Sequence, residues 1–111
     1  MVDRLGLVRA KIEVVDGDLF DVVAKRLGLM PEVVDAKLER GIPAFVLAQH
    51  LAKVEAGRLM AVERGISADL GGALMGLLAH SGACDQQRVM GGPPVPSLEE
   101  INRMLLLPPS I

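Results

Sequence analysis

The sequence predicts a mostly α-helical fold: a small helical bundle of tandem helix-turn-helix units, with a short N-terminal β-strand. Apolar residues recur at helical spacing over much of the chain, and glycine or proline stands where each run ends. An internal repeat is the third observation, because the 24-residue segments 21–44 and 45–68 share eight identical positions without a gap. Such a duplication indicates the unit from which the core is built.

Composition limits the chain to one domain with an aliphatic core. Half of the 111 residues are apolar, yet Phe20 and Phe45 are its two aromatic residues. So much aliphatic surface on a small chain predicts a homodimer or a partner that covers part of it. The single cysteine fits a reducing compartment, and no apolar run is long enough to cross a bilayer. We therefore expect a cytoplasmic protein without membrane contact.

The N-terminal part is predicted to be a strand over residues 7–15. Val8, Ala10, Ile12 and Val14 alternate with polar neighbours, which is the period of a strand with one buried face. A lone strand needs a partner, and the same strand of a second subunit is the simplest one. Tertiary packing could still make this segment helical. Residues 16–18 are expected to form a turn.

Helices are predicted for the segments that follow, at 19–27, 31–40, 43–64 and 68–80. Gly28 and Gly41 end the first two, and Pro31 suits the start of the second. Gly57 weakens the third by about 1 kcal/mol relative to alanine, so a break there is expected to be possible. Such a break would make the second repeat a helix-turn-helix like the first.

The chain divides into three predicted parts. Residues 1–81 form the helical core, and residues 82–96 form a linker rich in glycine, proline and polar residues. Residues 97–111 form a docking helix that begins with the capping box of Ser97 and Glu100. This helix could dock on its own subunit or on another protein, and the sequence leaves both open.

The segment VAKRLGLMPEVVDAKLERG, residues 23–41, resembles helix-turn-helix DNA-binding domains of the phage-repressor type. The resemblance rests on the small Ala24 in the first helix, Gly28 in the turn and bracketing apolar residues. It implies a small non-enzymatic DNA-binding regulator that acts as a dimer on double-stranded DNA. The phosphate contacts would then come from basic residues on and around the two helices, namely Lys25, Arg26, Lys37 and Arg40.

Two alternatives remain open on the sequence. The second helix carries Glu32 and Asp35 where DNA-binding helices usually offer basic or amide side chains, and residues 17–68 hold seven acidic and seven basic residues. This balance favours a protein-interaction adaptor or assembly subunit without nucleic-acid contact. A ribbon-helix-helix dimer, with Arg9 and Lys11 on paired strands, is the other alternative.

Catalytic and metal-binding patterns are not recognisable in the sequence. It contains neither a Gly-x-Ser-x-Gly motif nor a phosphate-binding glycine loop. His50 and His80 are expected to be packed helix residues, and Cys84 is expected to be an unreactive thiol in the linker. We expect no enzyme, no cofactor and no metal site.

Overall fold

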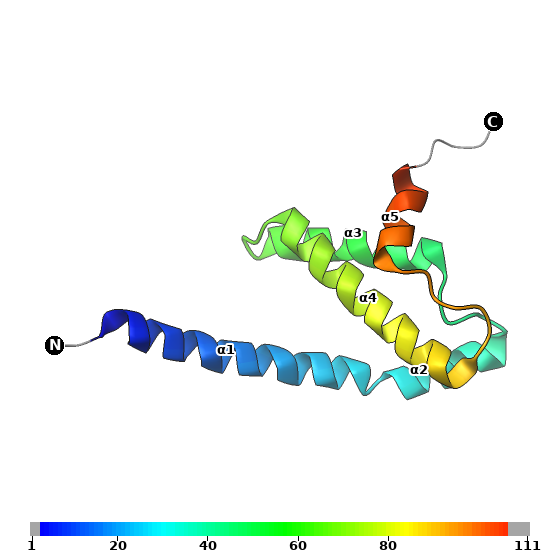
Figure 1. Cartoon of the computed structure of the whole chain (residues 1–111), viewed down its shortest axis with the longest axis horizontal. Coiled ribbons are helices and arrows are strands. Elements are labelled where there is room, and N and C mark those ends of the chain that lie inside the picture. Colours follow the sequence, from blue (N-terminus) through cyan, green and yellow to red (C-terminus); the bar gives the residue numbers. More distant parts are fainter. Residues whose placement is uncertain (1–2, 107–111) are drawn as a thin grey trace.

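The computed structural model describes residues 3–106, which form five helices and no strand. These are α1 (Arg4–Leu27), α2 (Met30–Arg40), α3 (Leu47–Glu63), α4 (Ala68–Met90) and α5 (Leu98–Leu106). The expected all-α class is confirmed. Helices α3 and α4 form a hairpin, α2 lies against the C-terminal half of α4, and α1 projects from the body as a long arm (Figure 1).

The predicted strand at 7–15 is wrong, because these residues lie within α1. The same stretch also fits a helical period, since large apolar residues recur three and four positions apart at Leu5, Val8, Ile12, Val15, Leu19 and Val22. A backbone with no strand beside it can satisfy its hydrogen bonds within a helix. The Asp3 carboxylate caps this helix by accepting a hydrogen bond from the Gly6 N–H at 3.0 Å. The predicted turn at 16–18 is likewise part of α1.

Helix α2 agrees with the predicted span 31–40 within one residue. Pro31 lies in its first turn, where its missing N–H costs no hydrogen bond. Gly41 ends the helix at φ 65°, a left-handed conformation that glycine adopts without strain.

Helix α3 runs through Gly57 without a break, so the second repeat does not form the helix-turn-helix expected of it. Gly57 and Gly71 instead bring α3 and α4 together. A Cβ added at Gly57 would lie 2.5 Å from the Gly71 carbonyl oxygen. The glycine that weakens the isolated helix therefore allows the closest contact of the hairpin.

Helix α4 is longer than the predicted 68–80 and includes residues 82–90, which were expected to belong to the linker. Ser67 caps its start, with Oγ accepting from the Leu70 N–H at 3.1 Å. Glycines and polar residues in this part face neighbouring helices instead of solvent: Gly82, Ala83 and Gln86 are buried. Their burial against α2 explains why a linker-like composition is helical here.

Helix α5 packs on its own chain in this structure. Ile101 is only 2% exposed, and the Ser97–Glu100 capping box forms as predicted. The Pro96 carbonyl oxygen, just before the helix, lies 2.8 Å from His80 Nε2 of α4. Residues 107–111 of the predicted docking segment lie outside the described residues.

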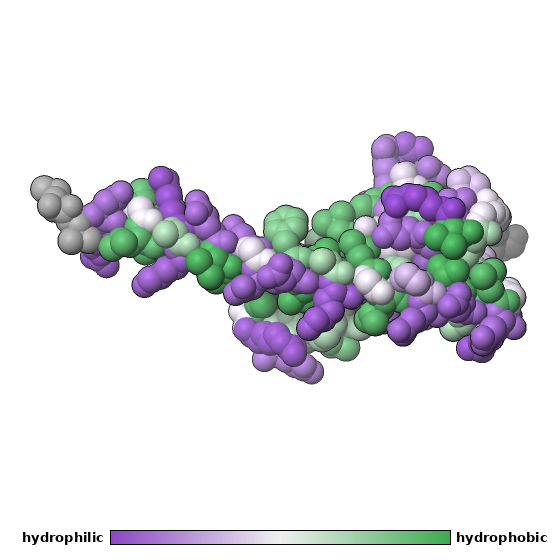
Figure 2. Space-filling model, turned by 90° about the horizontal axis from the view of Figure 1, so that it is seen from below, coloured by the Kyte–Doolittle hydropathy of each residue, from purple (hydrophilic) through white to green (hydrophobic). Residues whose placement is uncertain are grey.

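The molecule is elongated, with extents of 64 × 35 × 24 Å and a radius of gyration of 17.6 Å. A compact chain of this length would have a radius of about 13 Å. The difference comes from α1, which contains no buried residue, and Figure 2 shows hydrophobic side chains exposed along this arm. Within the described range, no helix is sufficiently long and apolar to traverse a bilayer. A cytoplasmic location stays a prediction.

Candidate active site

A cavity of about 380 Å³ opens where the end of α1, helix α2, the start of α3 and the C-terminal half of α4 meet. Its apolar wall includes Leu29, Met30, Val33, Phe45 and Ala83. Its polar side chains come from all four helices: Arg26, Lys37, Gln49, His50, Lys53 and Gln86. An apolar pocket with a few converging polar groups is the usual form of a small-molecule site.

The charge of this pocket is positive. Arg26, Lys37 and Lys53 line it, and no aspartate or glutamate is among its lining residues within the described chain. The whole chain carries a net charge of −2, so the excess of cations is a local property of the site. Clefts lined by one sign of charge attract ligands of the opposite sign.

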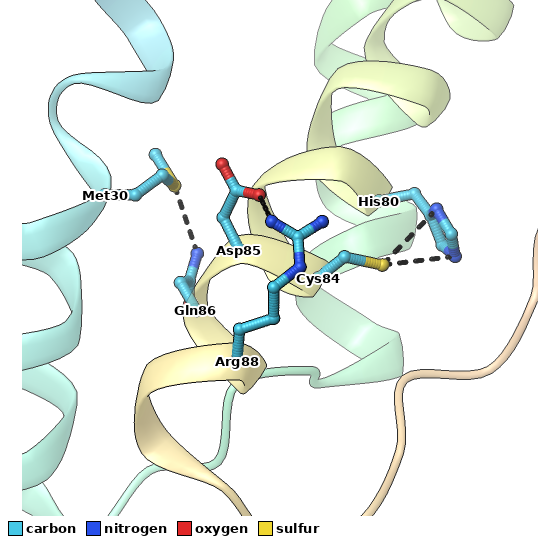
Figure 3. A network of polar contacts seen from close by, with 6 residues as sticks. All are labelled: Met30, His80, Cys84, Asp85, Gln86 and Arg88. Carbon is cyan, nitrogen blue, oxygen red and sulfur yellow. Dashed lines mark hydrogen bonds and ion pairs between the residues drawn. The ribbon is translucent and has the colours of Figure 1, made fainter.

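Lys37 is held at the centre of a hydrogen-bond network. Its ammonium donates to the Ala44 carbonyl oxygen at 2.8 Å and to Gln86 Oε1 at 2.7 Å. The Gln86 amide is buried, and its Nε2 donates to the Met30 sulfur at 3.3 Å (Figure 3). Burial lowers the pKa of Lys37 from its ordinary value. The hydrogen bonds thus fix the side chains of Lys37 and Gln86 before any ligand binds.

Arg26 reaches the site from the last turn of α1. One of its terminal nitrogens donates to the Leu78 carbonyl oxygen of α4 at 3.0 Å. The guanidinium has five N–H donors, so the others stay available to a ligand. A Cβ added at Gly82 would lie 3.0 Å from the Met30 sulfur and 3.3 Å from Arg26 Nη1. Gly82 therefore leaves the room that both side chains occupy.

His50 forms part of the pocket wall from the first turn of α3. Its ring is buried, and it lies at a tilt against Phe45 with the ring centroids 5.8 Å apart. Nδ1 has no hydrogen-bond partner among the described residues. Burial lowers the pKa of His50, and the neighbouring His80 lowers it further.

Two of the four residues predicted to contact DNA lie in this pocket. Arg26 and Lys37 line it together, whereas Lys25 and Arg40 are exposed and are not among the lining residues. The sequence reasoning missed Gln49, His50, Lys53 and Gln86. The spacing of Gln49 and Lys53, one helical turn apart, was a usable signal for a polar face. Gln86 gave none, because it was expected to lie in a linker.

Cys84 lies in α4 and not in a loop, one helical turn after His80. Its sulfur is 3.9 Å from His80 Nδ1, and the neighbouring Asp85 pairs with Arg88 at 2.6 Å (Figure 3). Cys84 and His80 are not among the pocket's lining residues. Within residues 3–106, no three His, Cys, Asp or Glu side chains come close enough together to hold a metal ion.

Comparison with known proteins identifies two similar sequences, both named T-protein. The chain is 38% identical to the T-protein of Haemophilus influenzae over 69 residues, which are 62% of this chain and 18% of that protein. It is 36% identical to the T-protein of Enterobacter agglomerans over 70 residues, which are 63% of this chain and 19% of that protein. The chain thus spans about a fifth of the length of these relatives. No family model and no solved structure matches.

The predicted function is wrong in view of these relatives. T-protein is the bifunctional enzyme chorismate mutase/prephenate dehydrogenase, and not a DNA-binding regulator. The expectation of a non-enzymatic protein, whether regulator or adaptor, is therefore corrected as well. The pattern of residues 23–41 led to the wrong function because two packed helices joined by a glycine turn use similar residues in DNA-binding and other proteins. The resemblance of residues 23–41 to helix-turn-helix domains stays a prediction from the sequence.

Proposed function

We propose that this chain is a chorismate mutase domain that converts chorismate to prephenate in the cationic pocket. Of the two activities combined in T-protein, the mutase fits this chain better. A dehydrogenase domain binds its dinucleotide on a parallel sheet with a glycine-rich loop. The described residues contain no strand, and the sequence lacks that glycine motif.

The chemistry of the reaction suits the pocket. Chorismate carries two carboxylates and an ether oxygen, and its rearrangement breaks one C–O bond while one C–C bond forms in the same molecule. No nucleophile, metal or cofactor has to take part. The enzyme must hold the two carboxylates so that the reacting carbons meet, and must stabilise the negative charge that builds up on the departing ether oxygen.

The observation that carries this proposal is the preorganised pair of Lys37 and Gln86 beside Arg26, in a pocket lined without carboxylates. Arg26 and Lys53 supply positive charge for the two carboxylates, and a guanidinium can bind a carboxylate through two parallel hydrogen bonds. Lys37 is positioned to donate to the ether oxygen. Because Lys37 is already fixed by Gln86 and Ala44, little reorganisation is needed as charge develops.

The test is the turnover of chorismate by the wild-type protein and by Lys37→Gln, followed as loss of chorismate and gain of prephenate. Loss of one preorganised donor costs a factor of about 10² to 10³ in kcat. Arg103→Gln is the matched control, because it removes a cation from exposed α5, where Arg103 pairs with Glu99. A wild-type rate equal to the uncatalysed one, or equal rates for both variants, would overturn the proposal.

We also propose that α1 pairs with α1 of a second copy, so that the active protein is a homodimer. Leu5, Val8, Ile12, Val15, Leu19 and Val22 are all exposed and alternate three and four positions apart, which is the seam of a coiled coil. A helix with such a stripe and no buried residue is expected to find a partner. This dimer would cover the largest exposed apolar surface of the arm.

Ile12→Glu tests the pairing, because it puts a charge in the middle of the seam. We expect it to sediment as a monomer at concentrations where the wild-type protein is a dimer. Ala10→Glu adds the same charge on the opposite side of α1 and should remain dimeric. A monomeric wild-type protein, or a dimeric Ile12→Glu variant, would contradict the pairing.

A further inference from the structure

Among the described residues, the unpartnered nitrogen of His50 is a polar group that the fold does not explain. The residue is 7% exposed, and its Nδ1 is the one fully buried side-chain nitrogen or oxygen among the described residues that has no hydrogen-bond partner. Buried polar groups in folded proteins nearly always have such a partner. His50 lies in the pocket wall, so a small turn of its ring on ligand binding would bring this nitrogen to a ligand that supplies the missing partner.

The charged groups around this ring favour its neutral form while the pocket is empty. Each of α1 to α4 contributes charged or titratable groups to the two cavities that His50 lines, whereas the α5 residues that line them carry no charge. The titratable groups lining the two cavities that His50 borders, together with its histidine neighbour, are Arg26, Lys37, Lys53, Arg58, Asp69 and His80. One of the six is acidic, and Asp69 is already paired with Arg58 at 3.1 Å. A proton on His50 would therefore add a further cation to a buried, positively charged site.

We propose that His50 is a ligand-contacting residue whose ring takes up a proton when a dicarboxylate binds, so that the pocket binds such anions more tightly as the pH falls. The inference rests on the proposed function, because it takes a dicarboxylate as the ligand of this pocket. It goes beyond that function by making His50 a determinant of which ligands bind. A doubly charged anion benefits from the proton, and an uncharged molecule of the same shape does not.

The direction of the pH effect follows from the two states of the pocket. In the empty pocket, burial and then the neighbouring His80 lower the pKa of His50. Two carboxylates would reverse the sign of the local field and raise this pKa, and both nitrogens of a charged imidazole are donors for carboxylate oxygens. A ligand that raises the pKa of a group binds more tightly below that pKa, and the advantage is lost as the pH rises through it. Each unit of rise corresponds to a tenfold gain in affinity at low pH.

The first measurement is the titration of the two histidines by NMR of the ring Cε1–H groups, in the full-length protein. The ligand is a stable bicyclic ether dicarboxylate shaped like the transition state of the rearrangement, which cannot itself react. Its carboxylates stay ionised between pH 5.5 and 8.0, so the ligand does not contribute to the pH effect. We expect the pKa of His50 to rise by at least about one unit on binding.

The second measurement is the dissociation constant of the same ligand by calorimetry at pH 5.5 and pH 8.0. We expect the wild-type protein to bind the ligand more tightly at pH 5.5 than at pH 8.0, with a gain that approaches about tenfold as the pH falls below the pKa of the free ring. His50→Gln keeps a polar side chain that cannot be charged, and its affinity should change little with pH. His80→Gln removes the neighbour that lowers the pKa of His50, so its affinity should still rise as the pH falls. The dimethyl ester of the ligand should bind with no pH dependence.

These measurements decide whether His50 takes up a proton when the dicarboxylate binds. An unchanged pKa of His50 on binding, or equal pH dependence in His50→Gln and wild type, overturns the inference. If chorismate is nevertheless converted, the proposed function stands without it. If the dicarboxylate binds at neither pH and chorismate is not converted, both the inference and the proposed function are overturned.

Discussion

Replacing Gly57 by alanine should destabilise the protein, although alanine is the better helix former. In an isolated helix this change would gain about 1 kcal/mol. In the hairpin, the new methyl group would lie 2.5 Å from the Gly71 carbonyl oxygen and would also collide with the Met75 side chain. Ordinary contacts of a Cβ atom begin near 3.4 Å, so α4 would have to move away by about 1 Å. The outer atoms of the Met75 side chain can rotate away, but its Cβ, 2.7 Å from the new methyl group, and the backbone of Gly71 cannot.

The expected size of the loss follows from these two terms. Overpacking of a closely packed contact costs about 1–3 kcal/mol, and a clash with backbone belongs at the upper end of that range. After subtraction of the helix-propensity gain, we expect a net loss of about 2 kcal/mol, which is about 8 °C in Tm for a chain of this length. The assay is chemical and thermal unfolding followed by circular dichroism at one fixed protein concentration, because a dimer's stability depends on concentration.

Gly17→Ala is the matched control. Gly17 lies within α1, and nothing lies within 4 Å of a Cβ added there. This variant should gain up to about 1 kcal/mol from helix propensity alone. The two substitutions are chemically identical and are expected to have opposite signs. If Gly57→Ala were as stable as Gly17→Ala, the close contact of α3 with α4 through Gly57 and Gly71 would be refuted.

Two further predictions concern α4. Ser67→Ala removes the oxygen that caps this helix and should lower the free energy of unfolding by about 1 kcal/mol, measured by denaturant titration. Ser81→Ala, at an exposed position within the same helix, should show no loss, and equal losses would contradict the cap. Gly82→Ala should change the free energy of unfolding by no more than about 1 kcal/mol, because its nearest neighbours are the flexible ends of Met30 and Arg26. It should nevertheless lower the turnover of chorismate several-fold by displacing Arg26, and an unchanged rate would show that Arg26 does not depend on this space.

The helical class and several helix boundaries were predictable because they depend on local interactions. Gly41 ends α2 because a residue without Cβ adopts φ 65° at low cost. Ser97 precedes α5 and fixes its start, because its side chain caps the helix. These caps involve residues within one helical turn of each other in the sequence. They are therefore visible in the sequence without any knowledge of the fold.

The strand prediction failed because one stretch carries two periods. Val8 and Ile12 fit both an alternating strand and a helical stripe, and local pattern cannot choose between them. The prediction of a linker at residues 82–90 failed for a related reason. Glycine and polar residues indicate a linker unless tertiary packing buries them. Gln86 is buried against α2 and hydrogen-bonded to Lys37, a contact across 49 residues of sequence.

The pocket itself could be decided only by the tertiary structure. The sequence by itself determined that the chain is helical, rich in aliphatic side chains and provided with basic residues at Arg26 and Lys37. It could not tell whether these cations point outward to a polyanion or inward to a small ligand, because the two arrangements use the same residues at the same helical spacing. The packing of α4 against α2 and the end of α1 made that choice, by bringing Gln86 and the backbone of Leu78 to within hydrogen-bond distance of the two cations.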